Sequence, residues 1–170
     1  YTLASGTSAD NYSIRTSYGW LIVNDRESKF EIVLEANGDE VLYDGEKHTV
    51  EGFKSTEFSF GGVKYTVSGI SARAAGMKAG THQVVTSGAP IVTDADGNDV
   101  TRQFRIKVQL ADLVINPRNV VMTSASASKV YDGSALTKEE VEVTGDGFAE
   151  GQGAKYTFSG TQTLVGSSIN

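Results

Sequence analysis

The residues best suited to chemistry are the oxygen-bearing side chains of one short loop, residues 93–99 (TDADGND). Calcium loops use carboxylates and amides at such spacings as oxygen ligands. An EF-hand-like loop also needs a bidentate Glu at its end, and none follows here. An Asp-Gly turn, in which an Asp side chain accepts hydrogen bonds from nearby backbone, uses the same residues. We therefore expect a structural turn, and the calcium alternative rests on Asp94, Asp96, Asn98 and Asp99.

The other ionisable residues do not form a pattern that predicts catalysis. Acidic pairs occur at residues 39–40 and 139–140, but neighbours in a strand point to opposite faces and do not form an acid/base pair. His48 and His82 have no Ser or Cys elbow nearby to complete a nucleophilic triad. We expect no enzymatic activity, no catalytic residue and no cofactor-binding residue.

Composition narrows the class of protein. The 170 residues carry 15 Lys and Arg against 21 Asp and Glu, a net charge of −6, which argues against nucleic acid and a bare anionic membrane as partners. Cysteine is absent, so disulfides and thiolate metal sites are excluded. Hydrophobic residues make up 39%, Gly is frequent, and no long segment has a 3.6-residue period. These features favour short strands joined by turns, an all-β fold.

Three stretches of the sequence occur twice. A shift of 92 positions without a gap places Tyr12 on Phe104 and Ile14 on Ile106, and extends to Arg26 on Arg118. The second pair is YDG at residues 43–45 and 131–133, and the third is GVKYTVSG at 62–69 with GAKYTFSG at 153–160. Independent matches at similar spacing predict a tandem repeat.

The repeats divide the chain into three parts. Residues 1–26 are expected to be the closing strands of a preceding, or head-to-tail completed, unit, with strands near Asn11–Ser17 and Trp20–Asn24. Residues 27–118 are expected to form a complete unit, and residues 119–170 the opening strands of another. One helical turn is expected at Ala72–Lys78. The strands expected in the complete unit are Phe30–Glu35, His48–Phe53, Glu57–Phe60, Val63–Ser68, Thr81–Thr86, Ala89–Thr93, Arg102–Val108 and Asp112–Ile115.

The first and last parts are complementary. The strands that residues 119–170 lack are those that residues 1–26 supply, so the chain has the content of one period of a two-domain repeat or of a fragment cut in that phase. We expect a cut through a longer polypeptide, whose neighbours are further repeats. In isolation, the ends are expected to complete one another head to tail between molecules by strand addition.

Trp20 and the repeated Tyr-Asp-Gly invite functional interpretations. Trp20 aligns with Asp112, so its position is expected to face outward. It is the candidate ligand-binding residue, stacking on a sugar ring, and the alternative is that it covers a domain junction near residues 26–29. For Tyr-Asp-Gly we expect a structural role, with the Tyr ring packed, its hydroxyl anchored and Asp-Gly turning the chain.

A Lys–Asn isopeptide cross-link is a further alternative. Lys29 and Lys107 are the candidate amines, with Asn24 and Asn116 as the amides. Lys107 alternates with Ile106 and Val108, so we expect it to face water and the cross-link to be absent.

The motifs also carry a resemblance to known repeats. KVYDG (129–133), GDGF (145–148), KYTFSG (155–160) and VGSS (165–168) resemble YDG-type repeats. Residues 97–118, from GNDVT to LVINPR, resemble the related MBG-type unit. Both are immunoglobulin-like repeats of very large secreted or wall-anchored bacterial surface proteins, often adhesins. The resemblance covers essentially the whole chain, and the lack of cysteine agrees with Gram-positive surface proteins.

The resemblance implies tandem immunoglobulin-like β-sandwiches, an extracellular cell-wall location and a stalk or adhesive role without catalytic residues. The expected function is a non-enzymatic spacer or adhesin segment with short, stiff linkers. The alternative is a module that binds carbohydrate or a host protein, within a surface adhesin or an extracellular hydrolase. The expected partners are neighbouring repeats or head-to-tail copies, and a host glycan or matrix protein. No nucleic acid or direct membrane contact is expected.

Overall fold

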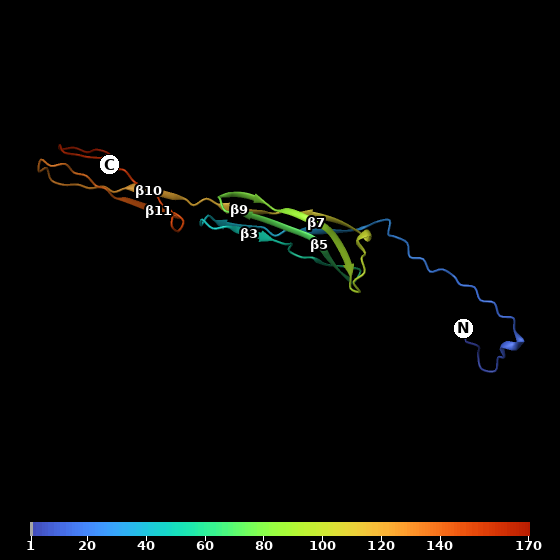
Figure 1. The fold of residues 1–170 in the computed structure, drawn as a ribbon. Coiled ribbons are helices and arrows are strands. Elements are labelled where there is room, and N and C mark those ends of the chain that lie inside the picture. The colour runs from blue at the N-terminus through green and yellow to red at the C-terminus, as the bar shows by residue number, and fades with distance from the viewer. Residues whose placement is uncertain (1) are drawn as a thin grey trace.

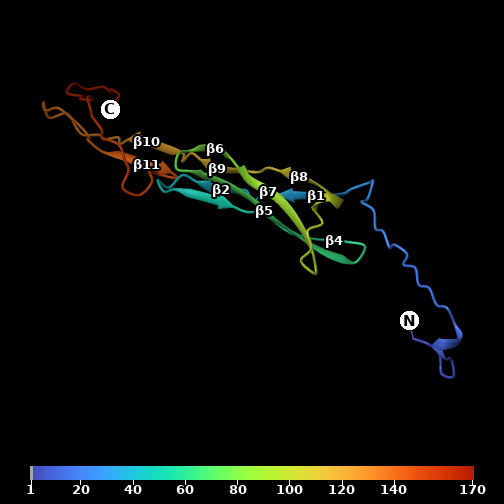
Figure 2. The same cartoon turned by 45° about the vertical axis from the view of Figure 1, so that its right-hand side comes forward.

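The chain is a row of three parts built almost entirely of strands and extended backbone. A computed structural model describes residues 2–170. Figure 1 shows an N-terminal arm (residues 2–26), a central unit (residues 27–118) and a C-terminal unit (residues 119–170) following one another along a long axis. The turned view in Figure 2 keeps the two ends of the chain on opposite sides of the central unit. The all-β prediction is confirmed.

The central unit is a two-layer, sandwich-like arrangement. In one layer, β1 runs parallel to β8, β2 runs parallel to β9, and β6 runs antiparallel to β9. In the other layer, the long strand β5 pairs with β4 and β3 at successive positions along one edge and with β7 along the other edge. The bounds are β1 (Phe30–Glu35), β2 (Asp39–Leu42), β3 (His48–Glu51), β4 (Glu57–Phe60), β5 (Val63–Gly76), β6 (Gly80–Gln83), β7 (Val85–Asp94), β8 (Phe104–Gln109) and β9 (Asp112–Asn116).

The core of the central unit lies between these layers in two clusters. Both draw on strands from each layer, because alternate residues of every strand face inward. An aromatic group extends the second cluster, with the Phe30 and Phe60 ring centroids 4.9 Å apart and Tyr65 edge-on to Phe104 at 4.9 Å. The buried members are Ala36, Ala72, Ala74, Val84, Leu113 and Ile115 in the first cluster, and Ile32, Leu34, Val67, Val92 and Phe104 in the second.

The expected helical turn at Ala72–Lys78 is wrong. Residues 72–76 are the end of the long strand β5, in which buried Ala72 and Ala74 flank exposed Arg73. That two-residue alternation is a strand pattern, and the small, helix-favouring alanines are buried by pairing with β3 and β7. The expected strands Thr81–Thr86 and Ala89–Thr93 are also redivided, because the break falls at buried Val84, between β6 and β7.

Two glycines allow β5 and β7 to approach each other. The register of this pair shifts between Ser68 and Ile70, a β-bulge at Gly69. Gly69 has φ +76° and Gly88 has φ +91°, a region that L side chains rarely adopt. A Cβ on Gly88 would collide with the carbonyl oxygen of Gly69. The bulge therefore needs glycine at both positions.

The C-terminal unit has far less regular structure. Strands β10 (Val120–Ser124) and β11 (Val141–Gly145) form an antiparallel pair, with Val120 opposite Gly145. Beyond this pair, a single bridge joins Leu136 to Gln162. Ala149 is the one buried hydrophobic residue among residues 119–170. This unit has a hairpin and long connections but no core of its own.

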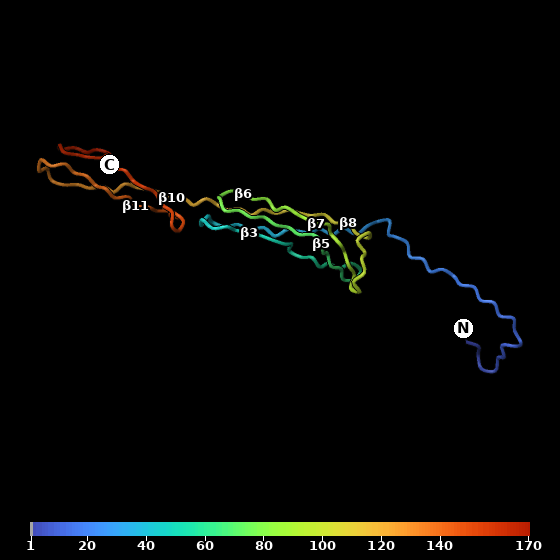
Figure 3. The backbone as a smooth tube through the Cα atoms, in the orientation of Figure 1, coloured from blue at the N-terminus to red at the C-terminus, as the bar shows by residue number. Residues whose placement is uncertain are grey.

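The N-terminal arm is extended and unpaired. Its one element is a short 3-10 turn, η1 (Ala9–Asn11), and the expected strands at Asn11–Ser17 and Trp20–Asn24 are not formed within the chain. A strand needs a neighbour for its backbone hydrogen bonds, and Figure 3 shows that the arm runs away from both units.

Candidate functional site

The loop at residues 93–99 is a self-bonded turn. Asp94 Oδ1 accepts hydrogen bonds from the backbone of Asp96 at 3.0 Å and of Asn98 at 2.9 Å. The Asn98 side-chain amide donates to Asp94 Oδ2 at 3.0 Å, and this bond lowers the pKa of the Asp94 carboxyl. The turn is closed by the Gly97 amide, which donates to the Asp94 carbonyl at 3.1 Å. The Asp-Gly turn predicted from the sequence is therefore present.

Asp99 serves the next element in the chain, the 3-10 turn η2 (Thr101–Gln103). Its Oδ1 accepts from the Thr101 hydroxyl at 2.6 Å and from the Thr101 backbone at 2.9 Å, and the hydroxyl bond lowers the pKa of the Asp99 carboxyl. Within residues 2–170, no group of three or more His, Asp or Glu side chains is placed to hold a metal ion. Hydrogen bonds of the turn involve both carboxylate oxygens of Asp94 and the Oδ1 of Asp99.

Trp20 lies in the middle of the N-terminal arm and is 90% exposed. It therefore does not cover the junction near residues 26–29. The arm is anchored only at its end, where Gln103 accepts from the Arg26 amide at 3.0 Å and donates to Asp25 at 2.9 Å. The Arg26 guanidinium also stacks over the Phe30 ring at 4.1 Å. Trp20 is available for contact with another molecule.

The first Tyr-Asp-Gly turn has the predicted structural role. Asp44 Oδ1 accepts from the Glu46 amide and from the His48 ring, and the His48 bond lowers the pKa of Asp44. Tyr43 packs against the core cluster that contains Leu113, and its hydroxyl accepts from Gln152 Nε2 at 2.8 Å. That last contact joins the central unit to the C-terminal unit.

The junction between these two units centres on Arg118. Its Nε donates to the Gly147 carbonyl at 2.7 Å, its Nη2 donates to the Asp146 carbonyl, and its Nη1 donates to the Tyr43 carbonyl at 3.2 Å. One guanidinium thus bonds to carbonyls of both units. Because the guanidinium presents its donors in a fixed planar fork, these bonds fix direction as well as distance.

The backbone around Arg118 completes the junction. The Asn119 amide donates to Asp146 Oδ2 at 2.7 Å, and the Asp146 amide donates to the Asn119 carbonyl at 2.7 Å. On the other side, the Tyr43 amide donates to the Asn116 carbonyl at 2.8 Å. These bonds bracket a linker of only two residues, Pro117 and Arg118, between β9 and the bonds of Asn119. The linker is thus as short as the sequence predicted, and hydrogen bonds lie on both sides of it.

Sequence reasoning expected a short linker but missed the role of Arg118. The available signal was the alignment of Arg26 with Arg118, which repeats a cation at the end of each closing hairpin. The partners of Arg118 are backbone carbonyls, and because every residue has one, the types of the partner residues do not reveal the contact. The loop at residues 145–152 was therefore not recognised as a contact surface.

An open groove of about 620 Å³ marks the C-terminal unit. It is lined by residues 124–129, Tyr131, residues 136–138 and residues 160–170. Its frame is held by Asn170, whose side-chain amide donates to the carbonyls of Ala125 and Lys138 at 2.8 Å each. Apolar side chains in and around it are exposed, including Val130 at 89% and Leu164 at 72%.

Two of the isopeptide candidates, Lys107 and Asn116, contact acidic side chains instead of each other. Lys107 is exposed on β8 and its ammonium pairs with Glu31 at 2.8 Å, while the Asn116 amide donates to Glu40 at 2.7 Å. The prediction that Lys107 faces water is confirmed.

Comparisons with known proteins give no match: no family model, no curated protein and no solved structure resembles this chain significantly. In the part of the chain that the structure describes, no helix has the length and apolar character needed to cross a membrane.

Proposed function

We propose that this chain is a non-enzymatic stalk segment of a bacterial cell-surface adhesin, made of tandem immunoglobulin-like repeats and located outside the cell. Residues 27–118 are one complete unit of the array, and residues 119–170 begin the next. In this role the protein is a passive spacer that holds a distal part of the molecule away from the cell wall.

The observation that carries the proposal is the Arg118 junction. A flexible connection would let successive units fold back on one another, whereas a stalk needs each unit to continue the direction of the last. Arg118 bonds to Tyr43 on one side and to Asp146 and Gly147 on the other, and Gln152 adds a second bridge to Tyr43. These contacts favour a fixed, end-to-end arrangement such as Figure 1 displays.

Two further observations support an immunoglobulin-like array. The central unit is sandwich-like, and its last strands β8 and β9 return to pair in parallel with its first strands β1 and β2. The first and last segments of the unit therefore lie side by side, and pulling on the two ends loads these hydrogen bonds in shear. The Tyr-Asp-Gly turns at residues 43–45 and 131–133 support the idea that the C-terminal unit starts in the same way.

Small-angle X-ray scattering on the full chain tests this proposal. A stalk segment is expected to give the scattering of a rod-like body, unchanged between low and moderate salt, because the junction is held by short hydrogen bonds. A profile of two independently moving bodies, or of a compact globule, would contradict it. Measurement at several concentrations, extrapolated to zero, removes the contribution of association.

The alternative function, binding of a carbohydrate or host protein, is favoured by one feature. The arm exposes Trp20 together with Tyr18, which is 92% exposed, and aromatic faces of this kind stack on sugar rings. Loss of mucin or glycan binding in Trp20→Ala, with binding retained in Arg15→Ala on the same arm, would establish this role. Absence of binding by the unmodified chain would exclude it for the glycans tested.

A further inference from the structure

We infer that residues 12–24 of the N-terminal arm insert into the groove of the C-terminal unit of a second copy of this chain, in the positions that β8 and β9 take in the central unit. The inference rests on the proposed tandem-repeat function and gives the partner, the site and the register. It follows from the exposure of both surfaces, from their relation to the central unit and from their charge.

The arm exposes residues whose counterparts are core residues. Leu21 and Val23 are 102% and 98% exposed, whereas the residues that align with them, Leu113 and Ile115, are 0% and 1% exposed. In the central unit, that pair of side chains lies between the layers as part of β9. Because burial of large apolar side chains stabilises a protein, covering these two side chains by a second molecule favours pairing of the arm.

The C-terminal unit exposes the complementary surface. The Tyr-Asp-Gly spacing places Met122 on Leu34, and the Ser124–Val141 pair then coincides with the Ala36–Phe53 bridge of the central unit. Leu34 is fully buried in the central unit, but Met122 is 52% exposed. In the central unit β8 lies beside β1, with Val108 in register with Leu34. Among residues 119–170 the structure places no strand in the corresponding position beside β10.

The central unit supplies the register. There, β9 runs parallel to β2 with Glu40 opposite Val114. Transferred by the repeat spacings, Ile22 of the arm lies opposite Ser128 of the second copy. Residues 127–129 line the groove, so the space beside Ser128 is open. The same transfer places Ile14 opposite Val120, beside the exposed edge of β10.

Arg26, which follows the inserted segment, corresponds to Arg118 at the junction between the central and C-terminal units. Arg118 donates to the Tyr43 carbonyl, and the aligned residues are Arg26 and Tyr131. On insertion, Arg26 is therefore placed to donate to the Tyr131 carbonyl of the second copy. Charge is also complementary, because the C-terminal unit carries three Lys against six Asp and Glu, while Arg15 is the only charged residue in residues 12–24.

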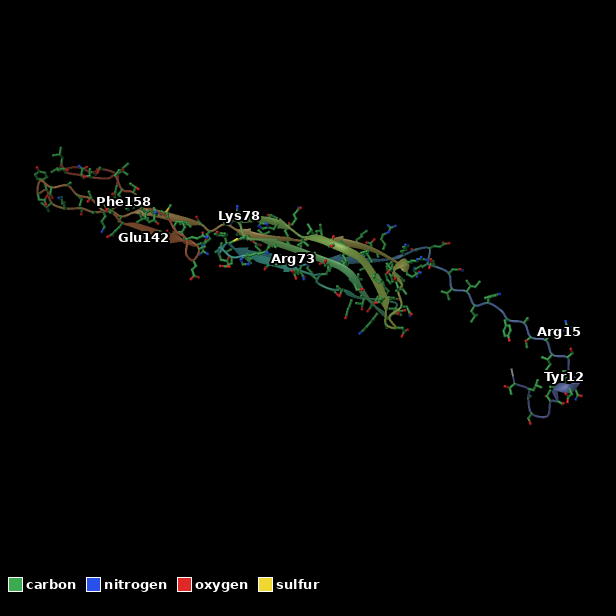
Figure 4. All side chains as sticks on the ribbon, viewed as in Figure 1. Tyr12, Arg15, Arg73, Lys78, Glu142 and Phe158 are labelled. Atoms are coloured by element: carbon green, nitrogen blue, oxygen red, sulfur yellow. The ribbon has the colours of Figure 1, made fainter. Side chains whose placement is uncertain are left out.

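The pairing must occur between molecules. Figure 4 places Tyr12 and Arg15 on the arm at one end of the molecule, and Glu142 and Phe158 at the other. Arm and groove are therefore separated by the whole central unit and cannot meet within one chain. Donor and acceptor surfaces are different, so the contact is heterologous and repeats in one direction, giving open-ended filaments.

Disulfide trapping tests the register directly, because the chain contains no cysteine. The Ile22→Cys variant of this 170-residue chain is mixed with its Ser128→Cys variant in a glutathione redox buffer, and cross-linked heterodimer is measured by mass. The matched control pairs Ile22→Cys with Lys129→Cys, one residue out of register, whose side chain points to the opposite face. Light scattering on the unmodified chain at rising concentration accompanies the trapping.

We expect the in-register pair to give at least about tenfold more heterodimer than the shifted pair. Adding Leu21→Glu to the Ile22→Cys chain should return the yield to the shifted-pair level, since a carboxylate would face the core. Leu21 is fully exposed in the single chain, so this variant leaves the fold intact, which circular dichroism verifies.

Equal yields from both pairs, or a chain that stays monomeric at about 0.1 mM by light scattering, would overturn the inference. Those results leave the stalk proposal standing if the two units keep a fixed spacing. Cross-linking in register combined with two freely moving units would instead support insertion and reject the stalk.

Discussion

Replacing Arg118 by Ala is expected to free the C-terminal unit from the central unit without unfolding either. The side chain makes three hydrogen bonds to carbonyls, at Tyr43, Asp146 and Gly147, and two of them are partly buried. A hydrogen bond from a charged donor contributes about 1.5–3 kcal/mol when removal leaves its partner unpaired, and less where water can replace it. We therefore expect the docked arrangement to lose about 2–3 kcal/mol, well below the sum of three separate bonds.

That loss corresponds to a roughly 30- to 140-fold shift in the equilibrium between docked and free arrangements. Hydrogen exchange measured by NMR reports it at the Asp146 amide, which bonds to the Asn119 carbonyl inside the junction. Exchange there should accelerate by up to this factor, while the amides of the β1–β8 ladder keep their protection. Nitrogen-15 relaxation should show the two units tumbling separately.

A matched control is Arg105→Ala, which removes an exposed arginine from β8, away from the junction. It should leave both the exchange rates and the tumbling unchanged. Unaltered exchange at Asp146 in Arg118→Ala would refute the reasoning, because the guanidinium would then carry no part of the docking. Equal acceleration throughout the β1–β8 ladder would also refute it, since the effect would be global unfolding.

Three further predictions concern the core, the bulge and acid stability. Leu113→Ala should lower the free energy of unfolding, measured in urea, by about 3 kcal/mol, because Leu113 is buried. Leu21→Ala should change the free energy of unfolding of the monomer by less than about 0.5 kcal/mol, because Leu21 is exposed. Equal effects of the two substitutions would contradict the assignment of core and arm. Gly88→Ala should cost roughly 2–3 kcal/mol in the same assay, because its Cβ meets a carbonyl oxygen at positive φ, and a neutral result would contradict the bulge. The hydrogen bond from the Lys129 ammonium lowers the pKa of the Asp132 carboxyl well below its usual range, and the bonds from Ser134 lower it further by smaller amounts. This stabilisation is present above the ordinary carboxyl pKa and is lost as pH falls through the lowered one, so the carbon-13 shift of Asp132 should titrate at higher pH in Lys129→Ala.

Much of the central unit follows from its sequence. Alternation of Phe30, Ile32 and Leu34 with polar or exposed neighbours predicts β1, and the structure has that strand with the expected bounds. The strands Glu57–Phe60 and Val63–Ser68 are expected to be separated by two glycines, and Gly61 and Gly62 both have positive φ in the turn between β4 and β5. These features are local, so a short window of sequence contains the information.

The remaining features depend on partners distant in the chain. The alanines of β5 have no strand preference of their own, and pairing with β3 and β7 decides their conformation. Residues 12–24 have a strand pattern but no neighbour in the chain, so they stay extended without a ladder. The junction of Arg118 with backbone carbonyls leaves no side-chain pattern to read. The alignment of residues 12–26 with residues 104–118 is the sequence feature that relates the arm to β8 and β9 and relates Arg26 to Arg118.

The most direct test of the proposed stalk is the distance between its two units in solution. Cysteines introduced at exposed Ser87 on β7 and Glu142 on β11 provide sites for two spin labels in a chain with no other thiol. Dilution with unlabelled chain isolates the intramolecular distance in a double electron–electron resonance measurement. A stiff junction predicts one narrow distance distribution, which broadens in Arg118→Ala. A broad distribution in the otherwise unmodified chain would contradict the proposal that these repeats form a stalk.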